Sequence, residues 1–170
     1  MITIRTYRSD DAASVGRLIA RTYSAFNLGF AAPDQQAGLL GPFRFAESAE
    51  RAHRTAVAEA IGAPNVLVAE EAGAIVGVLR GGRLDGRGRT VLQSLFVDAE
   101  HQRRGAGRRL VRRFEQECLA RGVTVVKVAS TLYAVPFYQA LGYRRSTGVR
   151  SMRSFQGSGL PYQPMRKTLG

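Results

Sequence analysis

The sequence has little cysteine and no long apolar stretch, and each shortage excludes a class of protein. Cys118 is the single cysteine, so no disulfide can form within the chain, which fits a reducing compartment. The longest apolar runs, such as Ala74 to Leu79, are far shorter than the roughly 20 residues of a membrane-spanning helix. The first seven residues indicate a strand and lack the pattern of a signal peptide. We therefore expect a cytoplasmic protein with no membrane partner.

Histidine is equally scarce. His53 and His101 are the only two, and with Cys118 they stand at unrelated spacings that do not form a zinc-site pattern. We therefore expect no metal. A ring at position 101 packs against the start of a following helix more often than it catalyses.

Acidic residues are few compared with basic ones. The chain has 25 lysines and arginines against 13 acidic residues, a formal net charge of +12, and nearly all of the basic residues are arginine. Such an excess can serve nucleic acid, a membrane surface or a small polyanion, or it can simply coat a solvated surface. Charge alone does not choose among these, so the positions of the arginines must decide.

The hydrophobic pattern of the 170 residues predicts one α/β domain that covers residues 1–170. Residues 25–46 hold several glycines and prolines and are expected to be mostly an irregular loop. The expected strands are 2–7, 66–69, 74–80, 91–97, 123–129, a short one from 143, and 162–169, and the expected helices are 10–24, 47–61, 105–121 and 134–141.

This order predicts a mixed central sheet of about seven strands flanked by about four helices. Short hairpin connections make the first half antiparallel. The strands 91–97 and 123–129 are joined by a helix, so we expect them to be parallel neighbours. Pro164 falls within the last strand, where it is expected at a sheet edge or a bulge.

One segment between a strand and a helix carries the signs of an anion site. The first N–H groups of a helix lack partners within it and lie at the positive end of its dipole. Gly105 and Gly107 would let a phosphate approach the backbone closely. Arg103, Arg104 and Arg108 add charge that can pair with phosphate oxygens.

The glycine spacing matches neither a dinucleotide fingerprint nor a P-loop. Instead, Gln102-Arg-Arg-Gly-Ala-Gly107 resembles the Q/R-x-x-G-x-G/A motif of the GNAT acetyltransferase superfamily. The preceding Leu-Phe-Val-Asp-Ala-Glu and the later Phe137-Tyr-Gln-Ala-Leu-Gly-Tyr143 are similar to the same superfamily, in the same order. The resemblance implies a single GNAT domain with acetyl-CoA as cosubstrate.

The resemblance also implies where acetyl-CoA would bind. The backbone of Phe96 and Val97 would run beside the pantetheine arm, and N–H groups from Arg103 to Arg108 would hold the pyrophosphate. The strands 91–97 and 123–129 would splay apart to admit the arm. Thr131 stands where the superfamily often has an asparagine, and an N-cap role remains equally open for it. The implied cofactor-binding residues are Phe96, Val97, Gln102, Arg103, Arg104, Gly105, Ala106, Gly107, Arg108 and Thr131.

Tyr138 matches the tyrosine that many relatives use as general acid, because a phenol is protonated at neutral pH. No general base is evident. Relatives often carry a carboxylate where this chain has Gln93 and Ser94, and Glu70 and Glu71 are better explained as solvated hairpin charges. Cys118 falls on an apolar helix face and is expected to be a buried small hydrophobe, which favours direct attack in a ternary complex over a covalent intermediate.

The expected activity is therefore N-acetyl transfer to a primary amine, with a small molecule as acceptor. We expect residues 25–46 and a hairpin near residues 154–161 to form the acceptor pocket. A protein or peptide acceptor, and a non-catalytic CoA-binding sensor, are alternatives. An RNA-binding module is a further one, but the helix 105–121 offers only Phe114 for stacking and turns it inward, so nucleic acid is not favoured. A homodimer remains open.

Overall fold

A computed structural model describes residues 1–26, 28–29, 31–152 and 160–170. Its strands are β1 Thr3–Thr6, β2 Asn65–Glu71, β3 Ala74–Leu84, β4 Arg89–Val97, β5 Val125–Thr131, β6 Arg144–Arg145, β7 Arg150–Met152 and β8 Leu160–Thr168. Its helices are α1 Ala12–Phe26, α2 Pro33–Leu40, α3 Arg51–Ile61, α4 Ala106–Ala120 and α5 Val135–Ala140. Short 3₁₀ turns are η1 Ser9–Asp11, η2 Gly41–Phe45, η3 Ala99–His101 and η4 Leu132–Ala134.

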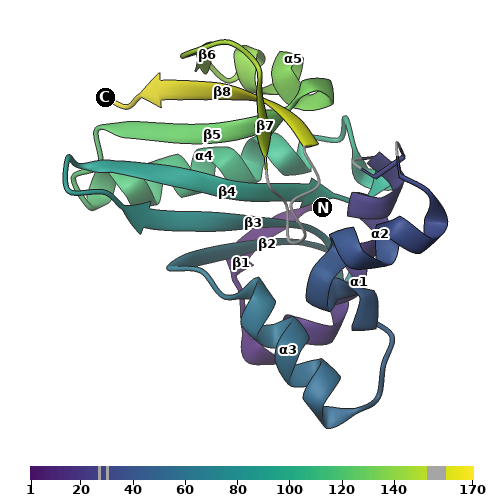
Figure 1. Cartoon of the computed structure of the whole chain (residues 1–170). Coiled ribbons are helices and arrows are strands. Elements are labelled where there is room, and N and C mark those ends of the chain that lie inside the picture. The colour runs from purple at the N-terminus through teal and green to yellow at the C-terminus, as the bar shows by residue number, and fades with distance from the viewer. Residues whose placement is uncertain (27, 30, 153–159) are drawn as a thin grey trace.

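The described strands form one mixed sheet in the order β1-β2-β3-β4-β5-β8-β6, and β7 pairs with β8 beyond the end of β6 (Figure 1). All neighbours are antiparallel except β4 and β5, which are parallel because α4 connects them. The fold class predicted from the sequence is thereby confirmed, including the parallel pair.

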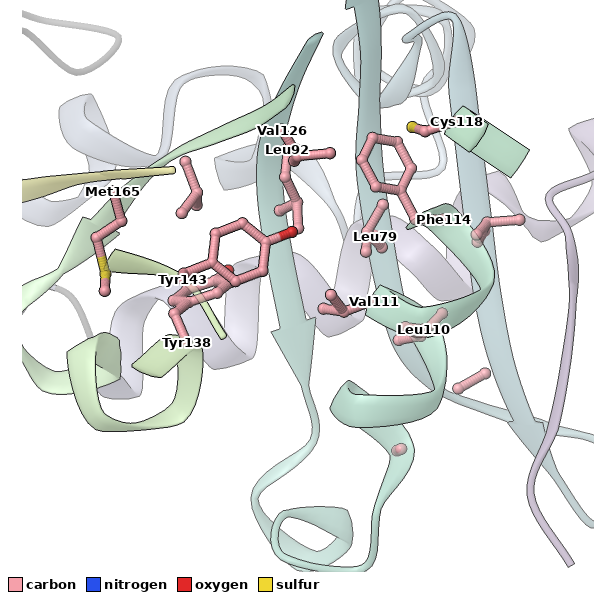
Figure 2. Close-up of a cluster of buried hydrophobic side chains, with 14 of the residues drawn as sticks. Leu79, Leu92, Leu110, Val111, Phe114, Cys118, Val126, Tyr138, Tyr143 and Met165 are labelled. Carbon is pink, nitrogen blue, oxygen red and sulfur yellow. The ribbon is translucent and has the colours of Figure 1, made fainter. Parts of the chain in front are cut away.

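Helices cover both faces of this sheet. On one face Leu110, Val111 and Phe114 of α4 pack onto β3, β4 and β5, together with residues of α5 (Figure 2). On the other face α1, α3 and η2 bury a second cluster that includes Val68 and Val78. In Figure 1, α4 lies behind the strands, and α1 to α3 lie in front of them. The sheet thus lies between two apolar layers, one on each face.

Two expectations about loops are wrong. Residues 25–46 are not mostly irregular: Pro33 occupies the first turn of α2, where its missing N–H costs nothing, and η2 follows directly. The connection between the expected strands 74–80 and 91–97 is also shorter, because β3 continues to Leu84. A Cβ on Gly81 would lie 2.6 Å from the Val91 carbonyl oxygen, so this glycine permits a close strand approach and does not mark a turn.

Pro164 lies in an inner strand, since β8 has β5 on one side and β6 and β7 on the other. Its position is tolerated because it falls between the residues that pair with β6 and those that pair with β7. The Pro164 carbonyl accepts a hydrogen bond from the Ser146 N–H, on the side of β8 that faces β6 and β7. In an antiparallel strand the N–H and the carbonyl of one residue point to the same side. The N–H that proline lacks would therefore have pointed into the gap between β6 and β7, where no strand residue needs it.

Candidate active site

The parallel strands β4 and β5 part in the middle of the sheet. Their pairing runs from Arg89 opposite Val125 to Leu92 opposite Val128 and then stops. Beyond this point β4 stays paired with β3 as far as Val97, and β5 stays paired with β8. The splayed pair expected from the sequence is present.

A bulge in β4 lies at the point where the strands part. Arg80 of β3 lies opposite Ser94 while the next residue, Gly81, lies opposite Leu92, so Gln93 is an extra residue in β4. A bulge bends its strand and increases the local twist, which turns the second half of β4 away from β5. The opening between β4 and β5 therefore results from the register of β4 against β3.

A cavity of about 470 Å³ occupies this opening and receives side chains from both faces of the sheet. None of the described residues that line it is an aspartate, a glutamate, a histidine or a lysine. The lining residues are Ile19, Thr22, Tyr23, Phe26, Phe43, Arg80, Gln93, Ser94, Leu95, Phe96, Val97, Gln102, Val128, Ala129, Ser130, Thr131, Tyr133, Ala134, Tyr138 and Leu160.

The loop before α4 presents a row of free backbone donors. Gly105 caps α4 in the left-handed region with φ of 88°, and Arg103 also has a positive φ of 61°. Among the described residues, no acceptor pairs with the N–H groups of residues 103–108, and the first bond into the helix is from the Arg109 N–H to the Gly105 carbonyl. A Cβ at position 105 would meet nothing within 4 Å, so the approach to these donors is open.

Gly107 also has a packing role that was not expected from the sequence. It is buried, and a Cβ there would lie 3.2 Å from Cζ of Phe137 and 3.5 Å from Cγ2 of Val97. Its missing side chain therefore lets the start of α4 pack closely on β4 and α5. Gln102 is also structural in part, because its Nε2 donates to the Val97 carbonyl at 3.1 Å and ties the loop to the end of β4.

The three arginines of the loop are not equivalent. Arg104 forms an ion pair with Glu71 at 3.1 Å, and Glu71 also contacts Nε2 of His101 at 3.2 Å. Glu71 is therefore an anchor of the loop and not the solvated hairpin charge that we expected. Arg103 and Arg108 are exposed and have no ion-pair partner among the described residues, so their guanidinium groups are available to an anion.

Tyr138 of α5 lies at the wall of the cavity. Its ring packs edge-on against Phe137 and Tyr143, with centroids 5.1 and 5.5 Å away, as Figure 2 shows for Tyr143. Its hydroxyl makes no hydrogen bond to a described residue. Burial raises the pKa of Tyr138, so the phenol keeps its proton well above neutral pH.

Thr131 also lines the cavity, at the N-cap position of η4, but its side chain makes no capping hydrogen bond there. Cys118 is buried outside the cavity, and burial raises the pKa of its thiol to about 11. Glu70 is bound to Arg5 at 2.8 Å and does not line the cavity.

Several lining residues come from the segment expected to form the acceptor pocket. Phe26 and Phe43 fall within residues 25–46, and Leu160 belongs to the segment 154–161, of which 154–159 lie outside the described residues. Sequence reasoning missed Thr22 and Arg80. The one available signal was an arginine in the middle of the apolar strand Ala74–Leu84, where a charge is unexpected.

Two further features are absent from the described residues. No helix there has the length and apolar character required to cross a membrane. No group of three or more histidine, cysteine, aspartate or glutamate side chains there could hold a metal ion.

Comparison with known proteins places this geometry in a family. Residues 31–169 match the family model described as an acetyltransferase (GNAT) domain. No curated protein sequence matches. Among solved structures, a GCN5-related N-acetyltransferase from Rhodopseudomonas palustris is 22% identical with a TM-score of 0.73, covering 98% of this chain and 95% of its own.

Two further solved structures share the fold over nearly their whole length. PaiA N-acetyltransferase from Thermoplasma acidophilum, in complex with coenzyme A, is 14% identical with a TM-score of 0.68 and 99% coverage of both chains. The ribosomal-protein-S18-alanine N-acetyltransferase from Escherichia coli is 18% identical with a TM-score of 0.64, covering 100% of this chain and 95% of that one.

Proposed function

This chain belongs to the GNAT acetyltransferase family, and from that premise we propose that it moves the acetyl group of acetyl-CoA to a primary amine of a small molecule. The reaction is direct attack by the amine on the thioester within a ternary complex. The observation that carries the proposal is the cavity between β4 and β5, which has an apolar, aromatic-lined interior and reaches Gln102, at the start of the loop that holds the free N–H donors of residues 103–108.

The two ends of acetyl-CoA fit two different parts of the site. The diphosphate suits the unpaired N–H groups of residues 103–108, helped by Arg103 and Arg108. The pantetheine amides suit the edge of β4 at Phe96 and Val97, whose backbone has no partner strand in the direction of β5. The residues present therefore fit acetyl-CoA as a substrate, with Thr131 as a further donor beside the arm.

The chemistry needs one proton donor and one proton acceptor. The amine lone pair forms a bond to the carbonyl carbon, the carbon–sulfur bond breaks, and the Tyr138 hydroxyl gives its proton to the departing thiolate. The amine then loses a proton to water, because no carboxylate or imidazole of the described residues lines the cavity. An amine that is protonated in solution must also give its ammonium proton to water before it attacks, because its lone pair forms the new bond.

The cavity volume of about 470 Å³ supports a small acceptor over a protein surface. A protein acceptor is the second candidate, since one structural neighbour is named for ribosomal protein S18. A sensor that binds CoA without turnover is the third. The cytoplasmic location and a homodimer remain predictions.

Calorimetry with coenzyme A tests the binding step. Gly105→Val should abolish the heat of binding, because the new side chain stands over the open donors of the loop. Gly122→Val is the matched control: it lies at the other end of α4, has a positive φ of 75°, and also meets nothing within 4 Å. Both variants carry a similar backbone strain, so loss of binding in both, or in neither, would contradict the assignment.

Release of free thiol from acetyl-CoA tests the reaction. Turnover with at least one amine from a panel of amino acids, polyamines, aminoglycosides and peptides is expected. Binding of coenzyme A without turnover of any amine would favour the sensor. RNA binding that is steeply salt-dependent and indifferent to acetyl-CoA would favour the nucleic-acid alternative.

A further inference from the structure

A buried positive charge lies on the side of the cavity away from Tyr138. Arg80 is only 6% exposed, lines the cavity, and has no ion-pair partner among the described residues. Burial lowers its pKa, as expected for a cation without a counterion. A buried charge is normally paired, so a lone one beside a cavity needs an explanation.

The hydrogen bonds of Arg80 leave one edge of its guanidinium free. Nε donates to the Ile61 carbonyl at 2.9 Å and Nη2 to the Ala60 carbonyl at 2.6 Å, at the end of α3. These bonds use the side edge of the planar group and hold it in one orientation. The end edge, formed by Nη1 and the second hydrogen of Nη2, has no partner among the described residues, and Nη1 is not sealed from solvent. Two parallel N–H groups are the geometry that binds a carboxylate in bidentate fashion.

Two hydroxyl groups in the same cavity are also unpaired. Oγ of Ser94 and Oγ1 of Thr22 are both buried without a hydrogen-bond partner. Ser94 lies opposite Arg80 in the β3–β4 pairing, so the two side chains are on the same face of the sheet. That face is the one covered by α1, which carries Thr22, as the neighbouring positions Val78 and Phe96 show.

Tyr138 belongs to the core cluster on the opposite face. The gap between β4 and β5 connects the two faces, so an acceptor on the α1 side would direct its amine toward the gap. Its other polar end would then meet Arg80, Ser94 and Thr22. All three groups donate hydrogen bonds, and the lining of the cavity contains no acidic residue to oppose an anion.

We propose that the acceptor is an amino acid with a free carboxylate, which Arg80 binds through its end edge with Ser94 and Thr22 as additional donors. This rests on the proposed function and names the acceptor class of the same site. A carboxylate fits better than a peptide N-terminus, because a peptide carbonyl at that position is neutral and would leave the guanidinium without a counterion.

Paired acceptors test the proposal directly. Initial rates are measured for the common amino acids, for their carboxamides and for the corresponding 1-aminoalkylphosphonates, with acetyl-CoA saturating. The best amino acid should exceed its carboxamide by roughly 10- to 100-fold in kcat/KM, the usual value of a hydrogen bond to a charged group. In Arg80→Gln the ratio of kcat/KM for the amino acid to kcat/KM for its carboxamide should fall to about threefold or less. Preference for the phosphonates would overturn the carboxylate assignment.

Matched variants separate recognition from folding. Arg83→Gln removes the same charge from an exposed position of the same strand and should leave the ratio unchanged. Arg80→Gln removes the hydrogen bonds that Arg80 donates to the last carbonyls of α3. If the variant does not fold for this reason, Ser94→Ala and Thr22→Val test the proposal, since neither hydroxyl has a hydrogen bond within the protein to lose. Each should keep the wild-type melting temperature and lower the ratio. An unchanged ratio in both would overturn the proposal.

The outcomes also distinguish failure of the acceptor class from failure of the function. If the enzyme acetylates carboxamides as well as acids, the carboxylate proposal is wrong and the acetyltransferase stands. If no amine is acetylated, calorimetry on the coenzyme A complex decides. Heat with an amino acid and none with its carboxamide would support the Arg80 site in a protein that does not turn over, and no heat with either would overturn it.

Discussion

At the scale of single residues, Tyr138 combines burial with an unpaired hydroxyl at the cavity. A phenol that is engaged elsewhere would be a poor proton donor, and this one is bonded to none of the described residues. Its raised pKa keeps the proton available across the neutral range. Proton donation to a leaving thiolate is therefore the role that this position supports best.

Tyr138→Phe should lower kcat by roughly 100-fold, the usual contribution of a general acid, because it removes only the proton donor. The melting temperature and the affinity for coenzyme A should stay close to the wild-type values, since no hydrogen bond is lost. Steady-state kinetics and calorimetry check this. Tyr143→Phe is the control: that hydroxyl is buried and does not line the cavity, so turnover should not change. Equal turnover in wild type and Tyr138→Phe would remove Tyr138 from the mechanism.

Gly105 and Gly107 show how two residues of one motif can differ. Gly105 has a left-handed φ and open space beside it, which would suit the proposed diphosphate, whereas Gly107 packs closely on Phe137. A sequence motif records that both positions need glycine. It does not record which of the two reasons applies, because one is a backbone angle and the other is a distance to a residue thirty positions away.

At the scale of elements, Arg5 joins three of them. It binds both carboxylate oxygens of Asp11 at 2.8 and 2.9 Å and Oε2 of Glu70 at 2.8 Å, linking β1 to η1 and β2. Asp11 also accepts the Arg8 N–H at 2.7 Å. The hydrogen bonds from Arg5 are the largest cause that lowers the pKa of Asp11 below its usual 3.8. This cluster therefore adds side-chain bonds to the backbone pairing that joins β1 to β2.

The lowered pKa gives a pH dependence with a definite sign. Because the folded pKa lies below the unfolded one, the stabilisation is complete above pH 4 or so and is lost as pH falls through the folded pKa. Asp11→Asn should therefore cost roughly 1 to 3 kcal/mol at pH 7, and its difference from wild type should shrink at lower pH. Urea unfolding from pH 7 to pH 3 measures this, with exposed Asp10→Asn as control. A difference that stays constant over the range would contradict the account.

At the scale of the whole molecule, a ligand that bridges the sheet should stabilise it. Coenzyme A contacts would span β4, the α4 start and α5, which belong to different parts of the chain. Coenzyme A at 100 times its dissociation constant should add about 2.7 kcal/mol to the free energy of unfolding, or roughly 5 to 10 °C in melting temperature for a domain of this size.

Thermal denaturation with and without ligand measures this shift. Pantetheine, which lacks the diphosphate, should give a much smaller shift at the same concentration. Gly105→Val should lose the shift from coenzyme A and keep any shift from pantetheine. Equal shifts from the two ligands would mean that the loop at residues 102–107 does not bind the diphosphate.

The sequence determined most of the elements and their order, though not α2 or β7, because strand and helix periodicity and the caps of helices depend on residues a few positions apart. A short motif and a resemblance to a family also singled out the loop whose N–H groups are unpaired and Tyr138, which lines the cavity. Residues 25–46 were misread, because glycine and proline indicate a turn but Pro33 in fact begins a helix.

The cavity, and with it the proposed amino-acid site, depends on tertiary structure alone. The opening depends on an extra residue in β4 relative to β3, and strand register is set by packing across the sheet. Thr22, Arg80, Ser94 and Tyr138 come together only because α1, two strands and α5 converge on one gap. A linear pattern carries no distance between such residues, so only the folded chain reveals that a charge, two hydroxyl groups and a phenol face the same space.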